Sequence, residues 1–297
     1  MQKIIEVVRL KTFEYHEPRT LEEASTLLSQ LGQDAMIYAG GTDIIPKIRY
    51  KRIFPAHLIN IKKIPQLNEI SCDKKLTIGA LATFNDICFS GIVKDKFQVL
   101  AEVCEHIASH QVRNLATIGG NICNAAPSAD SPPILMVYDS KVEIFDGRQT
   151  RSLLLENFFK GPGMTDLKKG EILTGIIIPE VPPNTGHAYI KHTIRKSLDI
   201  AIVGMAVSVT LDEADKCTAT CIVVGASAPV PLRTKLAEKY LIGTYLGPSD
   251  VEAAGIAAAN EISPIDDVRG SRNYRCEMTK INLKRAVELA SGRARHE

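Results

Sequence analysis

The sequence predicts an α+β fold in two parts, and three observations support this. In the second half of the chain, strand patterns come in succession and helical patterns follow them, which is typical of an α+β layer. The stretch 179–185 (PEVPPNT) holds three prolines in seven residues and cannot continue a strand ladder, so it predicts a boundary between domains 1–180 and 181–297. The GxGxxG fingerprint of a Rossmann domain is missing from the sequence.

The first elements follow from local patterns. Thr20 and Glu23 have the spacing of a capping box, and apolar residues at helical spacing then predict a helix that Gly32 ends. A short apolar strand at 35–39 runs directly into Gly40 and Gly41.

The later elements are predicted in the same way. Further strands are expected at 57–61, 76–81, 141–145 and 171–178, and helices at 94–110 and 132–138, the second with proline in its first turn. Beyond the boundary we expect an antiparallel sheet covered by helices, from strands at 189–194, 203–211 and 218–224 and helices at 234–242, 249–262 and 274–291.

Composition narrows the class of protein. The 297 residues carry a formal net charge of +2 and 45% apolar residues, which indicates an ordinary globular chain without a basic surface for nucleic acid. No apolar run is long enough to span a membrane, and residues 1–15 have no signal-peptide core, so a cytoplasmic protein with no membrane partner is expected.

Cysteine and histidine spacing predicts no metal site. The seven cysteines are scattered and include no CxxC pair, so neither a disulfide framework nor a zinc or iron–sulfur site is indicated. His106 and His110 share one face of the predicted helix but have no third ligand, and no catalytic triad pattern occurs.

Two glycine pairs are the candidate ligand-binding motifs of the sequence. Gly40 and Gly41 follow a strand, and Gly119 and Gly120 follow Thr117, so both pairs are interpreted as tight turns whose N–H groups converge on an anion. Neither turn contains Lys or Arg, which predicts that N–H dipoles and not ion pairs hold a diphosphate. Taken alone, each pair is more often a plain tight turn than an anion site.

The residues around these turns resemble a known family. Residues 38–45 (YAGGTDII) resemble the first flavin loop of the FAD subunits of molybdenum hydroxylases, and residues 111–131 (QVRNLATIGGNICNAAPSADS) resemble their second. This family includes the medium subunits of bacterial xanthine dehydrogenase and aerobic carbon monoxide dehydrogenase. The similarity runs from about Lys11 to the last helix. It implies a two-lobed FAD-binding domain of the vanillyl-alcohol-oxidase (PCMH) type, followed by a C-terminal domain of the carbon monoxide dehydrogenase flavoprotein type.

The resemblance also implies a set of cofactor-binding residues. One side of the diphosphate would meet Ile37, Tyr38, Ala39, Gly40, Gly41, Thr42, Asp43 and Ile44, and the other side Thr117, Ile118, Gly119, Gly120, Asn121 and Asn124. Asp130 would bind the adenosine ribose or, alternatively, cap the next helix. Leu173 would contact the flavin. Lys191 would lie near the isoalloxazine ring, or be a solvated strand residue, and the residue that stacks on the ring, Ile107 or Tyr189, stays open.

The implied function is electron transfer by FAD that is bound non-covalently, since neither glycine motif contains a histidine for covalent attachment. The molybdopterin cofactor and the [2Fe-2S] clusters are expected in two partner subunits, in a dimer of heterotrimers, with NAD or another final acceptor. The molybdopterin subunit would select the substrate, and a purine or N-heterocycle is favoured. Two alternatives remain: a stand-alone flavin oxidoreductase with its own substrate pocket, and a flavin-free assembly protein.

Overall fold

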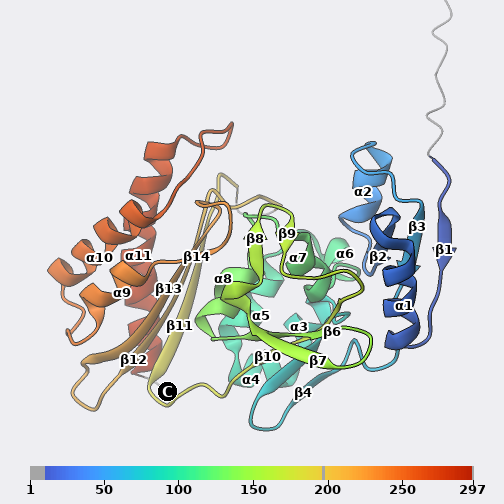
Figure 1. Ribbon diagram of the computed structural model, residues 1–297. Helices are drawn as coiled ribbons and strands as arrows, with labels where there is room; N and C mark the ends of the chain where they lie inside the picture. Colours follow the sequence, from blue (N-terminus) through green and yellow to red (C-terminus); the bar gives the residue numbers. More distant parts are fainter. Residues whose placement is uncertain (1–10, 196–197, 296–297) are drawn as a thin grey trace, which may run out of the picture.

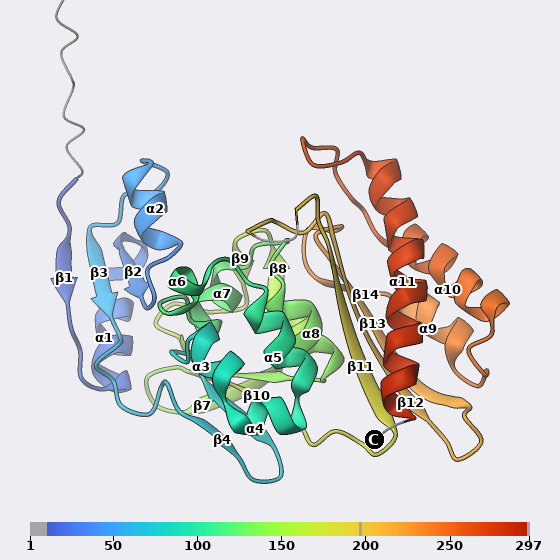
Figure 2. The ribbon, with the colours of Figure 1, turned by 180° about the vertical axis from the view of Figure 1, so that it is seen from behind.

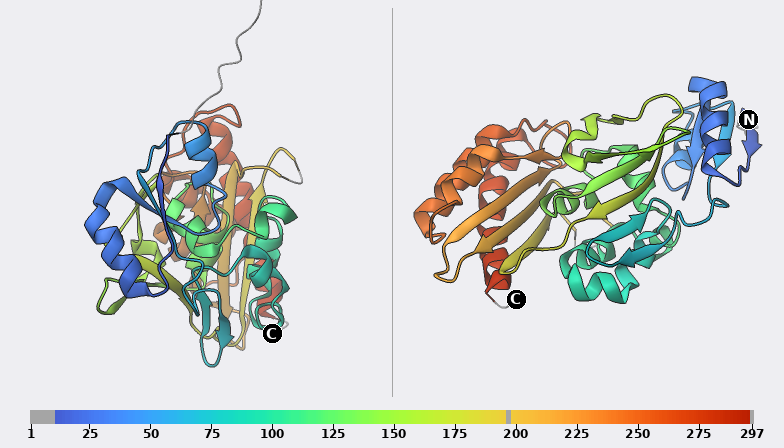
Figure 3. Two further views of the ribbon diagram at one scale, coloured as in Figure 1. Left: turned by 90° about the vertical axis from the view of Figure 1, so that its right-hand side faces the viewer. Right: turned by 60° about the horizontal axis from the view of Figure 1, so that its bottom comes forward.

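The computed structural model describes residues 11–195 and 198–295 (Figure 1). Along the chain it forms an N-terminal lobe, a second lobe and a C-terminal domain. The N-terminal lobe and the C-terminal domain lie at opposite ends of the molecule, with a second lobe between them (Figure 3). Within the described ranges, no helix has both the length and the apolar character needed to cross a membrane.

The N-terminal lobe is a small parallel sheet with two main helices. Its strands pair in the order β1-β3-β2. The elements are β1 (Glu14–His16), α1 (Leu21–Leu31), the 3-10 turn η1 (Gly32–Asp34), β2 (Ala35–Tyr38), α2 (Ile44–Arg49) and β3 (His57–Asn60). Helix α1 begins as predicted, because the Thr20 side chain accepts a hydrogen bond from the N–H of Glu23 at 3.1 Å.

The second lobe is built on an antiparallel sheet with strand order β4-β5-β10-β6-β7. Its strands and turns are β4 (Ile70–Cys72), β5 (Leu76–Gly79), β6 (Lys141–Phe145), β7 (Thr150–Leu154), η2 (Leu155–Asn157), β8 (Phe159–Gly161), β9 (Met164–Thr165) and β10 (Ile172–Ile178). Six short helices pack around it (Figure 2): α3 (Phe84–Phe89), α4 (Gly91–Lys96), α5 (Gln98–Glu105), α6 (His110–Arg113), α7 (Ile118–Asn124) and α8 (Ser131–Val137).

The single helix predicted at 94–110 is wrong, because the backbone breaks twice there. Phe97 has φ −139°, outside the helical range, and its buried ring packs on Tyr138 with ring centroids 5.5 Å apart. Ala108 has φ +48°, which ends the helical path before α6. His106 and His110 therefore lie on separate elements and do not share a helical face.

The C-terminal domain has the predicted α+β arrangement. Its antiparallel sheet has the order β11-β12-β13-β14. The elements are β11 (Thr185–His192), β12 (Val203–Leu211), β13 (Cys217–Gly225), β14 (Leu232–Arg233), α9 (Lys235–Leu241), α10 (Pro248–Glu261) and α11 (Arg272–Ala294). Strand β11 begins at Thr185, earlier than predicted, and the domain boundary at 180 stays a prediction.

Helices cover both faces of this sheet. Met205 and Val207 of β12 belong to the core beneath α9, α10 and α11, whereas Ala206 belongs to the core of the second lobe. Because side chains alternate along a strand, one strand serves two cores, and a continuous apolar run such as β12 is the sequence that this position requires. The second lobe and the C-terminal domain therefore share buried surface.

Candidate functional site

A cavity of about 410 Å³ lies between the N-terminal lobe and the second lobe. Its walls come from the loop after β2, from the start of α7, from Ala80 and Leu81 after β5, and from Ile172 and Leu173 of β10. This volume is in the range of small-molecule and cofactor sites.

The two glycine pairs meet at this cavity. A Cβ at Gly40 would lie 1.9 Å from the carbonyl oxygen of Leu115, so the first loop packs directly against the backbone that leads into the second motif. Gly41 has φ +78°, a conformation that L side chains rarely adopt. Glycine is thus needed at Gly40 for close approach and at Gly41 for backbone conformation.

The first loop presents free donors. Within residues 11–195 and 198–295, the N–H groups of Gly40, Gly41 and Thr42 have no hydrogen-bond acceptor in the protein, and all three residues line the cavity. Unpaired N–H groups of residues that line a cavity are available to bind an anionic group.

The second motif is not a turn, contrary to the prediction, but the first turn of α7. Thr117 is the N-cap, and its Oγ1 accepts the N–H of Gly120 at 3.1 Å. The N–H of Gly119 donates to the carbonyl of Ala80 at 2.9 Å, and a Cβ on Gly119 would lie 2.6 Å from Ala80. Gly119 is therefore a packing glycine, and these two N–H groups are already engaged.

A cation from outside the two glycine loops also lines the cavity. Lys47 of α2 lines the cavity, and its Nζ donates to Oδ1 of Asn124 at 2.5 Å. This bond joins α2 to α7 across the site. A lysine next to free N–H groups suits a diphosphate, which carries several acceptor oxygens and negative charge.

Most predicted residues share the cavity wall, namely Ile37, Ala39, Gly40, Gly41, Thr42, Asp43, Ile44, Thr117, Gly119, Gly120, Asn121, Asn124 and Leu173. Four predicted residues do not line it. The ring of Tyr38 turns toward β1, with Tyr15 at 6.3 Å and the Nζ of Lys62 at 4.2 Å from its centroid. Ile118 is fully buried in the core of the second lobe.

The other two residues, Asp130 and Lys191, form a separate cluster between the second lobe and the C-terminal domain. Lys191 Nζ lies 2.9 Å from the Asp130 carboxylate, and Tyr189 donates its hydroxyl to the same carboxylate at 2.8 Å. Side-chain exposure is only 15% for Lys191 and 11% for Asp130. Lys191 is therefore not a solvated strand residue.

Burial raises the pKa of Asp130, and Lys191 opposes this rise by stabilising the carboxylate. Asp130 stands at the N-cap position of α8, but its side chain makes no capping hydrogen bond. The cluster reaches the cavity indirectly, since Ser131 donates to Oδ1 of the lining residue Asn121 at 2.8 Å.

Sequence reasoning missed several wall residues, including Lys47, Ala80, Leu81 and Cys123. Lys47 lies two residues after the first motif and one helical turn after Asp43, so the start of a helix at the end of this motif was the available signal. Burial raises the pKa of Cys123 to about 12, which favours the neutral thiol at neutral pH.

Comparisons with known proteins agree with this architecture. Residues 11–181 match the FAD binding domain in molybdopterin dehydrogenase, and residues 188–290 match the CO dehydrogenase flavoprotein C-terminal domain. The chain is 35% identical to the carbon monoxide dehydrogenase medium chain of Hydrogenophaga pseudoflava, over 95% of this chain and 98% of that protein. It is 32% identical to the xanthine dehydrogenase FAD-binding subunit of Escherichia coli O157:H7, over 94% and 97%.

Solved structures agree as well. A chain of the Hydrogenophaga pseudoflava carbon monoxide dehydrogenase that lacks the Mo-pyranopterin moiety matches with a TM-score of 0.93 and 34% identity, over 96% of this chain and 99% of that one. Fold and cavity thus define a flavin-binding protein of the molybdopterin dehydrogenase type. The chain belongs to the family of FAD-binding medium subunits of molybdenum hydroxylases, an oxidoreductase family in which the molybdopterin and iron–sulfur centres belong to partner subunits.

Proposed function

We propose that this chain binds one FAD non-covalently in the cavity and transfers electrons from the [2Fe-2S] clusters of an iron–sulfur subunit to an acceptor such as NAD. The observation that carries the proposal is the pairing of a loop with free N–H groups and a lysine-bearing helix at one cavity. When bound, FAD supplies redox chemistry that can accept single electrons and release a pair.

The residues present fit a dinucleotide. The N–H groups of Gly40, Gly41 and Thr42 and the ammonium of Lys47 would bind the diphosphate, since these are the free donors and the cation of the wall. Gly120, which has no side chain, would let the diphosphate approach α7 closely. Leu173 offers an apolar surface to the rest of the cofactor.

Asp130 and Lys191 would act at the isoalloxazine end. A paired, largely buried lysine has a fixed position, and a cation held near the ring would stabilise negative charge on the reduced cofactor. In this proposal Asp130 is a positioning residue for Lys191 and not a ribose ligand, because it does not line the cavity and its carboxylate contacts Lys191 and Tyr189.

We further propose a complex with an iron–sulfur subunit and a molybdopterin subunit, as a dimer of heterotrimers. Relatives at comparable identity are named for different substrates: carbon monoxide, xanthine, and nicotine in the nicotine 6-hydroxylase medium subunit of Paenarthrobacter nicotinovorans. Because the sequence identity is about the same whichever substrate the relative is named for, it supports a role in electron transfer, with the substrate selected by the molybdopterin subunit.

The proposal is tested by purifying the chain alone and with its neighbouring subunits. Absorbance bands near roughly 370 and 450 nm, and release of the flavin by acid, are expected for non-covalent FAD. Reduction of this flavin by the substrate of the molybdopterin subunit should require the iron–sulfur subunit. A colourless chain would favour an assembly protein, and substrate-driven flavin reduction in the isolated chain would favour a stand-alone oxidoreductase.

A further inference from the structure

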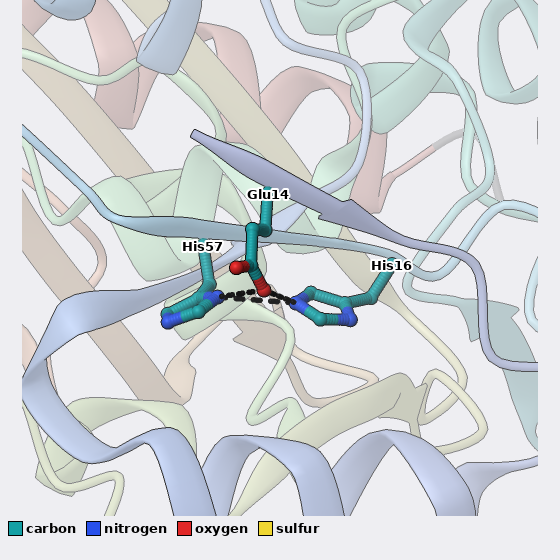
Figure 4. A group of neighbouring side chains, drawn as sticks. All are labelled: Glu14, His16 and His57. Carbon is teal, nitrogen blue, oxygen red and sulfur yellow. Dashed lines mark hydrogen bonds and ion pairs between the residues drawn. The ribbon is translucent and has the colours of Figure 1, made fainter. Parts of the chain in front are cut away.

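A cluster of two histidines and one glutamate lies on the N-terminal sheet, outside the flavin cavity (Figure 4). The parallel pairing of β1 and β3 builds it, with Glu14 opposite His57 and His16 opposite Ile59. Glu14 and His16 are two residues apart on one strand, so they share a face, and His57 is the cross-strand neighbour of Glu14 on that face.

Three potential ligand atoms converge at this point. His16 Nε2 lies 3.2 Å from His57 Nδ1, and Oε2 of Glu14 lies 3.3 Å from His57 Nδ1 and 3.8 Å from His16 Nε2. Figure 4 shows the carboxylate pointing between the two rings. These spacings leave a position roughly 2.0–2.1 Å from all three atoms, which is the bond length of Zn²⁺ to imidazole nitrogen and carboxylate oxygen.

We propose that Glu14, His16 and His57 bind a divalent transition-metal ion, with Zn²⁺ as the reference ion. Two imidazole nitrogens and one carboxylate favour a borderline metal such as Zn²⁺, whereas Mg²⁺ and Ca²⁺ prefer all-oxygen sites. The two imidazoles are partly sheltered, with side-chain exposures of 25% and 19%, while Glu14 is 73% exposed. The ion therefore reaches the site from solvent, and water completes its coordination.

A metal ion at this site would link the edge strand β1 to its neighbour β3. Strand β1 has only three residues, and its described neighbour in the sheet is β3. A metal held by two residues of β1 and one of β3 closes a loop of about forty residues, which constrains the unfolded chain and stabilises the lobe. The site is separate from the cavity wall, so this inference does not depend on flavin binding.

The test is a Zn²⁺ titration of the full-length chain, without an affinity tag and freed of metal by chelator. Calorimetry is expected to give one Zn²⁺ per chain. Glu14→Gln, His16→Gln and His57→Gln should each weaken binding by more than about 100-fold, because loss of a ligand exceeds the 10–100-fold effect of losing a ligand's own hydrogen-bond partner. Co²⁺ should give the visible absorption of a four-coordinate site.

The matched control is His110→Gln, which removes an exposed histidine far along the sequence and should leave the titration unchanged. Flavin content and far-UV circular dichroism establish that each variant is folded, and Glu14 is exposed enough for its substitution to leave the fold intact. The proposal is overturned if the unaltered chain does not bind Zn²⁺ with a micromolar or lower dissociation constant. It is also overturned if the Glu14 and His57 variants bind Zn²⁺ as tightly as the His110 control does.

Discussion

Gly40 and Gly41 lie in a loop whose N–H groups are free, whereas Gly119 and Gly120 begin a helix in which theirs are already bonded. The same dipeptide thus has two physical roles at one cavity. In the first segment glycine permits the positive φ of Gly41 and the close approach of Gly40 to Leu115, and in the second it allows α7 to pack on Ala80. Identical motifs therefore call for different tests.

The largest effect is expected from Gly40→Ala. Its Cβ would lie 1.9 Å from a backbone oxygen, so the two segments must separate, at a cost of roughly 3 kcal/mol in the free energy of unfolding and with loss of flavin. Gly91→Ala is the matched control, because a Cβ on Gly91 would meet no atom within 4 Å. Urea denaturation and the flavin-to-protein ratio measure both, and equal results for the two variants would contradict the distinction.

Gly120→Val should separate stability from cofactor binding. The larger side chain enters the cavity, so flavin retention should be lost, while the flavin-free chain should stay within about 1 kcal/mol of the unaltered flavin-free chain. Absorbance after gel filtration measures retention. If this variant keeps its full flavin complement, Gly120 does not face the diphosphate.

Lys47→Met tests the cation of the first segment. Loss of one charge-assisted hydrogen bond to a diphosphate should weaken FAD binding by about 10–100-fold, and the remaining affinity should depend less on salt. Arg49→Met, on the same helix and exposed, is the control. An unchanged dissociation constant and salt dependence for Lys47→Met would leave the N–H groups as the sole anion donors.

A dependence of stability on pH is expected for the second segment, which Ser131 and Asp130 link to the C-terminal domain. Lys191→Met should raise the pKa of Asp130 further, since burial already raises it and Lys191 opposes this. In the folded variant the Asp130 carboxyl would then stay protonated to a higher pH than in the unfolded chain. The stability of the variant relative to the unaltered chain should therefore fall as the pH rises above about 4. Urea denaturation at pH 5 and pH 8 measures this, with Lys191→Arg as the control. A pH-independent difference would argue against this coupling.

Local signals predicted much of the fold and part of the site. Thr20 and Glu23 predicted the start of α1, and the double glycine predicted the first loop, because these effects act within a few residues. The start of α7 was missed although Thr117 is an ordinary N-cap residue, since the glycine pair suggested a turn. The break at Phe97 depends on packing against Tyr138, which sequence periodicity does not report.

The features that the sequence did not predict depend on contacts between residues far apart in the chain. Asp130 and Lys191 are separated along the chain by helix α8 and strands β6 to β10, so neither residue's pattern indicated the other. His16 and His57 lie forty-one positions apart and meet only through parallel strand pairing, which is why histidine spacing predicted no metal site. Residues that meet across strands need the register before their chemistry can be inferred.

The attachment of the N-terminal lobe has a practical consequence. Its small core includes Leu81 and Ile172 of the second lobe, and both residues also line the cavity, as does Gly40 at the contact with Leu115. The surface that holds the lobe is thus largely the surface that would hold the cofactor. Proteolytic nicking of the connection at 61–69 should accordingly report the fraction of molecules that lack flavin in a preparation.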